Sequence, residues 1–231
     1  MAGVKTYWYL TRASGAVALI LLTLTIVIGI AAVGRAQSRR WPRFAVDAQH
    51  RSTSLLAFVF LIVHIATAVL DSFAPISLTD ALIPFIGAYR PLWLGLGATA
   101  FDLLLAVAVT SLIRDRLGRR SWRAVHWLVY AAWPVAVLHG LGTGSDTGQG
   151  WMTLVYLACA AAVAAAILMR IVVGWPQDMA WRLGGAAALA AFALGVALWL
   201  PSGPLGRGWA RRAGTPTQLL RSPGAGRRRG S

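Results

Sequence analysis

Six long apolar runs constrain this chain more than any other feature. They cover roughly residues 15–34, 51–70, 91–113, 124–141, 151–173 and 181–200. An α-helix needs about 20 apolar residues to cross the hydrocarbon core of a bilayer. Inside lipid the backbone polar groups must be bonded within the protein, and a continuous apolar run achieves this as a helix. The sequence therefore predicts an all-α fold, a polytopic membrane helical bundle with six transmembrane helices.

The composition excludes an ordinary soluble domain. Of the 231 residues, 58% are hydrophobic and 13% are charged, and the net charge of +15 comes from 22 Lys+Arg against 7 Asp+Glu. Such a charge can indicate nucleic-acid binding. Here the arginines cluster between apolar runs, where they set topology and contact anionic lipid. We therefore expect membrane lipid as a partner and no nucleic acid. The single Cys159 excludes an internal disulfide and a thiolate metal cluster.

The arginines also predict the orientation. Five follow the first apolar run and five follow the third, whereas the second connection has one arginine and the fourth has none. Since basic residues favour the cytoplasmic side, the first and third connections should be cytoplasmic and residues 1–14 external. Six spans then place residues 201–231 outside, although this segment holds seven arginines. Its Gly, Pro, Ser and Arg content predicts a disordered tail. We expect a multi-pass protein of the plasma membrane.

The four histidines of the chain form two pairs on two predicted helices. His50 and His64 lie on the second apolar run and its cytoplasmic flank, and His126 and His139 bracket the fourth. Both helices are predicted to run from the cytoplasm outward. His50 and His126 should thus share one depth near the cytoplasm, and His64 and His139 a second depth. At about 1.5 Å per residue the two depths are roughly 20 Å apart.

Helix geometry supports one pair better than the other. Fourteen residues separate His50 from His64, and on an ideal helix the second side chain returns to within about 40° of the first. Thirteen residues separate His126 from His139, which leaves a mismatch of about 140°. Pro134 stands between them, and proline kinks a helix. We expect a kink with local unwinding to bring His139 to the side of His126.

Ionisable side chains inside a membrane are rare and point to function. Imidazole is a common axial ligand of haem iron, so two histidines that face each other at one depth can hold a haem between two helices. The pattern predicts two such haems, with His50, His126, His64 and His139 as ligands to iron; a single haem on His64 and His139 is the alternative. Zinc fits less well because no Cys, Asp or Glu lies near a pair. A proton relay would not need this pairing.

The motifs H-x13-H (His50, His64) and H-x12-H (His126, His139), with WRAVHWLVYAAWPVAVLHGLGTG, resemble the ferric reductase-like transmembrane domain. NADPH oxidases, iron reductases and the haem subunit of the bacterial methionine sulfoxide reductase system share this domain. The resemblance covers roughly residues 8–175 and is closest to small actinobacterial members. It implies two b-type haems, each bridging two helices, and electrons that enter from the cytoplasmic side.

The chain departs from the large oxidases of that family. Their first helix has no counterpart, and the helix within residues 176–200 is additional to a haem-binding core over residues 15–175. No G-x-G-x-x-G occurs in a strand–helix unit, so no nucleotide-binding domain is expected. The electron donor should then be a separate flavoprotein or membrane quinol. By analogy with the methionine sulfoxide reductase system, an external redox partner protein is also expected.

Four further residues have predicted roles near the haems. Arg51 follows His50 directly, Arg123 precedes His126 by three residues, and with Arg43 these cations could pair with the propionates of the inner haem. Ordinary topology charge explains them equally well. Asp102 lies in the middle of the third apolar run, where a carboxylate is costly. It would bond the free N–H of a ligand histidine, carry protons, or be a neutral acid bonded to a neighbouring helix.

The sequence as a whole predicts a membrane cytochrome b that passes electrons across the bilayer to an external acceptor. It would be an electron-transfer subunit of an oxidoreductase, with haem b as the cofactor. Two other classes stay open: a haem-free membrane transporter or scaffold, and a cytochrome b that oxidises quinol.

Overall fold

A computed structural model describes residues 2–33, 42–173 and 179–220 of the chain, and within these ranges it contains helices and loops but no strand. Six helical segments are long and apolar enough to cross a membrane. They are α1 (Ala2–Val33), α2 (Arg43–Leu70), α4 (Pro91–Leu112), the consecutive α6 (Arg119–His126) and α7 (Val129–Thr143), α8 (Gly150–Val173) and α9 (Met179–Trp199). The prediction of an all-α bundle with six spans is confirmed.

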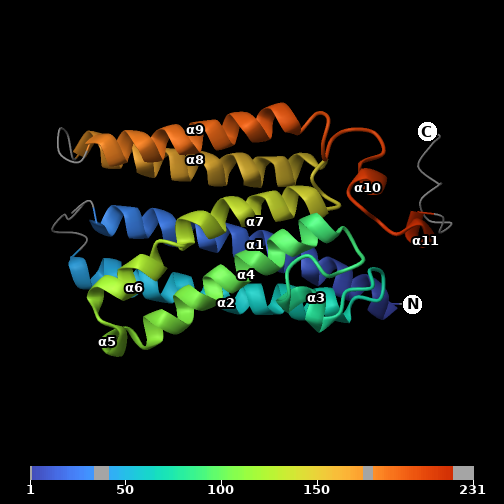
Figure 1. Ribbon diagram of the computed structural model, residues 1–231, viewed down its shortest axis with the longest axis horizontal. Coiled ribbons are helices and arrows are strands. Elements are labelled where there is room, and N and C mark those ends of the chain that lie inside the picture. Colours follow the sequence, from blue (N-terminus) through green and yellow to red (C-terminus); the bar gives the residue numbers. More distant parts are fainter. Residues whose placement is uncertain (1, 34–41, 174–178, 221–231) are drawn as a thin grey trace.

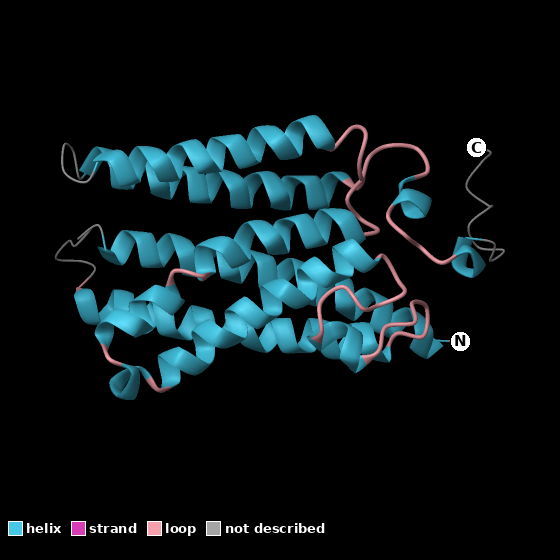
Figure 2. Cartoon of the chain, viewed as in Figure 1, coloured by secondary structure: helices cyan, strands magenta, loops and turns pink. Residues whose placement is uncertain are grey.

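The long helices lie side by side along the longest axis of the molecule (Figure 1). Helix α1 occupies the middle and packs against α2, α7 and α8, while α4 packs along α7 and α9 packs on α8. The short helices α3 (Leu78–Leu82), α10 (Trp209–Arg212) and α11 (Thr217–Leu220) lie at one end, which we call the outer end. Helix α5 (Arg114–Leu117) and α6 lie at the opposite, inner end. Most loops lie at these two ends, and a short break between α6 and α7 lies within the bundle (Figure 2).

The buried core lies between α1, α7 and α8. Its members are apolar side chains at helical spacing on the three facing surfaces: Leu19, Leu22, Ile26, Ile30, Trp133, Val137, Leu141, Cys159, Val163 and Ala166. A buried polar contact crosses this core, where the indole N–H of Trp133 donates to Thr23 Oγ1 at 2.9 Å. Because a buried indole N–H needs an acceptor, Thr23 fixes the register between α1 and α7.

The outside of the bundle is apolar. Large hydrophobic side chains are exposed along the spans, among them Leu55 (62%), Val172 (74%) and Leu198 (72%). A water-soluble protein rarely exposes apolar surface on this scale, whereas lipid tails solvate it. Together with the six long helices, this surface is that of a multi-pass membrane protein.

Both chain ends differ from the prediction in their local structure. Residues 2–14, expected to be an external segment, continue α1 as helix. Residues 201–220, expected to be disordered, are ordered at the outer end and include α10 and α11. The order has a physical cause: Trp209 Nε1 donates to the carbonyl of Gly142, and the backbone N–H of Arg90 donates to Gly214. The remainder of the predicted tail lies outside the described residues.

Helix α9 determines where this C-terminal segment lies. It runs the length of the bundle and returns the chain to the outer end, the end at which α1 also begins (Figure 1). The arginines of residues 201–220 therefore lie at the same end of the bundle as the second and fourth connections.

Candidate functional site

The four histidines meet as two pairs, as their spacing predicts. His50 on α2 faces His126 at the end of α6, with ring centroids 6.2 Å apart. His64 on α2 faces His139 on α7, with ring centroids 6.3 Å apart. We call these the inner pair and the outer pair, since they lie toward the inner and outer ends of the bundle.

Three of the four imidazoles are held from behind by a backbone carbonyl. His50 Nδ1 lies 3.1 Å from Thr25 O, His64 Nδ1 lies 2.8 Å from Thr11 O, and His139 Nδ1 lies 2.8 Å from Trp93 O. A carbonyl oxygen can only accept, so each Nδ1 must carry the proton and donate it. The proton-free Nε2 then keeps its lone pair, which is the form of imidazole that binds a metal ion.

A glycine makes room for each of these three rings. Gly15 lies beside His64, Gly29 beside His50 and Gly97 beside His139. In every case the glycine stands four residues after the carbonyl that accepts the bond, one helical turn further along α1 or α4. A Cβ at Gly15 would stand 2.8 Å from His64 Nδ1, too close for a real contact. The glycines therefore let the imidazoles approach the backbone of the neighbouring helix.

His126 is held differently. Its Nδ1 is buried and has no hydrogen-bond partner among the described residues. The ring instead stacks on the indole of Trp122, with centroids 4.9 Å apart and an interplanar angle of 29°. Trp122 Nε1 in turn donates to Ser111 Oγ on α4 at 3.3 Å. An aromatic side chain thus supports this histidine in place of a carbonyl.

The mismatch of the H-x12-H spacing is resolved at the junction of α6 and α7. Here Leu128 N donates to Val125 O and Tyr130 N to Trp127 O, a tighter i→i−3 pattern. Such winding turns about 120° per residue instead of 100°, so a few steps recover much of the missing rotation. Pro134 stands inside α7, just after this stretch. The expected local unwinding is therefore wrong: the chain is wound more tightly at this junction, and the tight stretch precedes the proline.

The distance between the paired rings fits a metal ion that both imidazoles bind. Metal–imidazole bonds are about 2.0–2.1 Å long and a ring nitrogen lies about 1.1 Å from the ring centre, so two imidazoles on opposite sides of one ion have centroids roughly 6.2–6.4 Å apart. The observed 6.2 and 6.3 Å agree with this value. In the described part of the chain α2 and α7 make almost no direct contact with each other. The pairs therefore suit a flat group that lies between α2 and α6 at the inner pair and between α2 and α7 at the outer pair.

The described residues contain no group of three or more His, Cys, Asp or Glu side chains placed to hold a metal ion. Each pair offers two imidazoles only. This donor set does not make a tetrahedral zinc site, and it matches haem iron, for which the porphyrin supplies the other four nitrogens.

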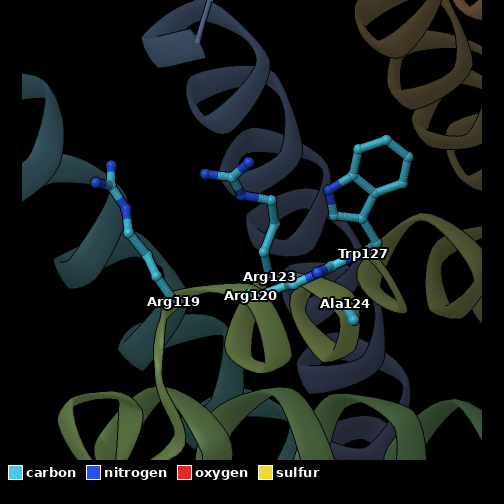
Figure 3. A pocket seen from close by; sticks show the side chains of 5 residues that line it. All are labelled: Arg119, Arg120, Arg123, Ala124 and Trp127. Carbon is cyan, nitrogen blue, oxygen red and sulfur yellow. The ribbon is translucent and has the colours of Figure 1, made fainter.

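The predicted propionate partners lie at the inner end with their side chains exposed. Arg51 and Arg43 are on α2, and Arg123 is on α6 beside His126. Arg123 lines an open pocket together with Arg119, Arg120, Ala124 and Trp127. Arg119, Arg123 and Trp127 extend from the same side of the chain (Figure 3). This pocket concentrates positive charge next to the inner pair.

Asp102 does not contact any histidine. No hydrogen bond or ion pair to its side chain is present among the described residues, and three histidine N–H groups donate to carbonyls instead. The expectation that Asp102 orients a ligand histidine is therefore wrong. The expectation of a bond to a neighbouring helix is not met either.

Sequence reasoning missed Arg90, which organises the outer end. This arginine is 9% exposed and adopts a left-handed backbone conformation with φ of 43°. Its guanidinium donates to the carbonyls of Gly142 and Thr143 and to Thr215 Oγ1, and so joins α4, α7 and the C-terminal segment. An isolated arginine just before Pro91, the first residue of α4, was the available signal.

Three tryptophans pack together beside Arg90. The Trp93 ring lies 5.0 Å from that of Trp199 and 5.2 Å from that of Trp209, and the carbonyl of Trp93 holds His139. This tryptophan cluster connects the outer pair to residues 199–209, which lie beyond the four-histidine core.

The connection between α7 and α8, at the outer end of the bundle, is held by side-chain bonds to α1 and α7. Asp146 forms an ion pair with Arg12 of α1, and Thr147 Oγ1 donates to Leu141 O at 3.1 Å. Arg12 stacks on Trp8 at 3.7 Å. Gly142 makes room for the ring of Trp93.

Comparison with known proteins agrees with this arrangement. The family described as ferric reductase like transmembrane component matches residues 14–137, more than half of the chain. The matched region includes His50, His64 and His126 and ends just before His139. No individual curated protein and no solved structure matches the chain. The chain belongs to the ferric reductase-like transmembrane family.

Proposed function

We propose that the chain is a membrane cytochrome b that carries electrons across the bilayer through two b-type haems, one on each histidine pair. The observation that carries the proposal is the ring separation of 6.2 and 6.3 Å at two depths, which suits one iron per pair. Membership of a family named for transmembrane ferric reductase components supports electron transfer as the activity.

The residues of this chain have separate tasks in the proposal. The imidazoles hold each iron from both sides, and the carbonyls of Thr11, Thr25 and Trp93 fix three of the rings in the tautomer that leaves Nε2 free. The haem, when bound, supplies an iron that gains and loses one electron. Because two imidazoles would hold each iron, an acceptor would be reduced without binding to the iron itself.

The direction of transfer follows from the charges. Arginines on α2, α5 and α6 surround the inner end, which the positive-inside rule assigns to the cytoplasm. Electrons would enter at His50 and His126 and leave near His64 and His139. In this reading Arg51 and Arg123 neutralise propionates of the inner haem. The donor is a separate flavoprotein or quinol, and the acceptor is an external redox partner, with the plasma membrane as the location.

The test is the haem content of the purified full-length protein. We expect two haems per chain and a b-type band in the reduced-minus-oxidised spectrum. His50→Ala and His64→Ala should each remove one haem, whereas Ser54→Ala, a control on α2 whose hydroxyl bonds only helix carbonyls, should remove none. One haem that only His64→Ala removes would indicate the single-haem alternative. No haem at all would leave a transporter or scaffold.

The identity of the donor needs a second measurement. A quinol-oxidising cytochrome b would be reduced by added quinol alone. If the protein is reduced only when a flavoprotein reductase is present, the quinol alternative is excluded.

A further inference from the structure

We propose that Trp122, which is hydrogen-bonded to Ser111, positions His126. When this support is lost, the iron of the inner pair should be the one that binds an external ligand. The inference rests on the proposed function. It concerns a residue to which neither the histidine motifs nor the family match assigns a role.

The first argument is a pattern and its one exception. Three histidines share the same support: a carbonyl that accepts from Nδ1, and a glycine four residues later that admits the ring. On α1 the two carbonyl–glycine sets, Thr11 with Gly15 and Thr25 with Gly29, are fourteen residues apart, which matches the separation of His64 and His50.

On α4 the position fourteen residues after a supporting glycine is occupied by Ser111. Fourteen residues after Gly97 the chain has serine instead of glycine. This serine accepts a hydrogen bond from Trp122, and the Trp122 ring lies against His126. The tryptophan therefore takes the place that a helix backbone has at the other three histidines. His126 is the one imidazole of the four whose buried Nδ1 has no partner among the described residues.

The second argument is the location of His126 in its helix. It is the last residue of α6, and the tight i→i−3 turn begins immediately after it. His50, His64 and His139 are all inside long helices. His126 is therefore less restrained than the other three histidines, both by its own helix and by a carbonyl partner. The stack with Trp122 is its main side-chain support.

The chemical consequence concerns the strength of the metal bond. An imidazole that donates its second N–H to a carbonyl is oriented and made more basic, and loss of such support typically costs about 10–100-fold in metal affinity. His126 lacks this donation. When it dissociates, the Nε2–iron bond breaks and its electron pair stays on the nitrogen. Carbon monoxide can then donate its own lone pair to the ferrous iron, and no electron or proton is consumed.

The experiment uses the purified full-length protein, reduced with dithionite and exposed to carbon monoxide. In Trp122→Ala we expect one of the two haems to bind carbon monoxide, about tenfold or more faster than in the unmodified protein. Trp122→Phe keeps an aromatic ring over His126 and should restore most of the original behaviour. Trp181→Phe changes a tryptophan that is 81% exposed on α9 and should have no effect.

The haem on the outer pair serves as the internal control for folding, since it should stay unreactive in every variant. The inference is overturned if Trp122→Ala keeps two haems that both ignore carbon monoxide, or if both haems respond equally. If Trp122→Ala loses the inner haem, the haem content of Trp122→Phe is the deciding measurement. The inference requires that Trp122→Phe contains the inner haem. A protein without any haem would instead contradict the proposed function.

Discussion

Gly15 and His64 meet across the α1–α2 interface with no space for a methyl group, since a Cβ on the glycine would lie 2.8 Å from the imidazole Nδ1. The contact lets the ring reach the carbonyl of Thr11. At the other end of the same interface Gly29 is less crowded, with a Cβ expected 3.3 Å from His50 Cε1. Residues without any functional group thus set where the proposed ligands stand.

Because Gly15 is more crowded than Gly29, substitution by alanine should have a larger effect at Gly15. Gly15→Ala should displace His64 and cause loss of the outer haem, whereas Gly29→Ala should retain most of the inner haem because a small shift relieves a 3.3 Å contact. Haem-to-protein ratios of the purified variants measure both. Gly195→Ala on α9, where a Cβ meets nothing within 4 Å, is the control. Equal haem content in Gly15→Ala and the control would contradict this account.

Removal of positive charge near the inner pair should lower the reduction potential of one haem. Arg51→Gln and Arg123→Gln each take away a cation that favours the more negative reduced state of the haem. Because both side chains are exposed, we expect a shift of roughly 10–40 mV, the equivalent of about 0.2–1 kcal/mol. A spectroelectrochemical titration measures it, with Arg116→Gln in α5 for comparison. An unchanged inner potential would assign these arginines to topology alone.

Arg90 should control the order of the C-terminal segment. Arg90→Ala leaves the carbonyls of Gly142 and Thr143 without this donor and frees Thr215. We expect trypsin to cut several-fold faster after Arg207, Arg211 and Arg212, because local opening exposes the chain there. The cleavage rate in detergent, followed by mass spectrometry, tests this. Arg116→Ala at the inner end should leave it unchanged.

The bond between Trp133 and Thr23 should contribute measurably to stability. Thr23→Val preserves shape but leaves a buried indole N–H without its acceptor, at a cost of about 1–3 kcal/mol. A lower midpoint of thermal unfolding in detergent is the expected result. Thr25→Val is the matched control, because the Thr25 hydroxyl bonds only Leu21 O of its own helix. A midpoint that falls equally in both variants would show that the inter-helix bond is unimportant.

The sequence predicted those features that depend on local composition. Apolar runs are long enough to identify six spans, and fourteen residues between His50 and His64 return to one face of any regular helix. The pairing of His126 with His50 followed from the predicted topology. The position of His139 opposite His64 depended on the tighter winding after Val125, and no pattern in the sequence specifies that winding.

Long-range contacts were beyond sequence reasoning. A carbonyl that accepts from a histidine has no signature of its own, although the fourteen-residue interval of Gly15 and Gly29 repeats that of the histidines. The order of residues 201–220 was missed because a Gly-, Pro- and Arg-rich composition is typical of disorder. Here Arg90 and Trp93, more than one hundred residues earlier, give that segment its partners.

The three carbonyl supports come from α1 and α4, two helices that carry no histidine. One residue inserted between Thr11 and Gly29 would rotate one support by about 100° relative to the other, while α2 kept its own phase. Helix α1 should therefore tolerate substitutions at many positions but no change of length, because it sets the spacing of two histidines, His50 and His64, that belong to another helix.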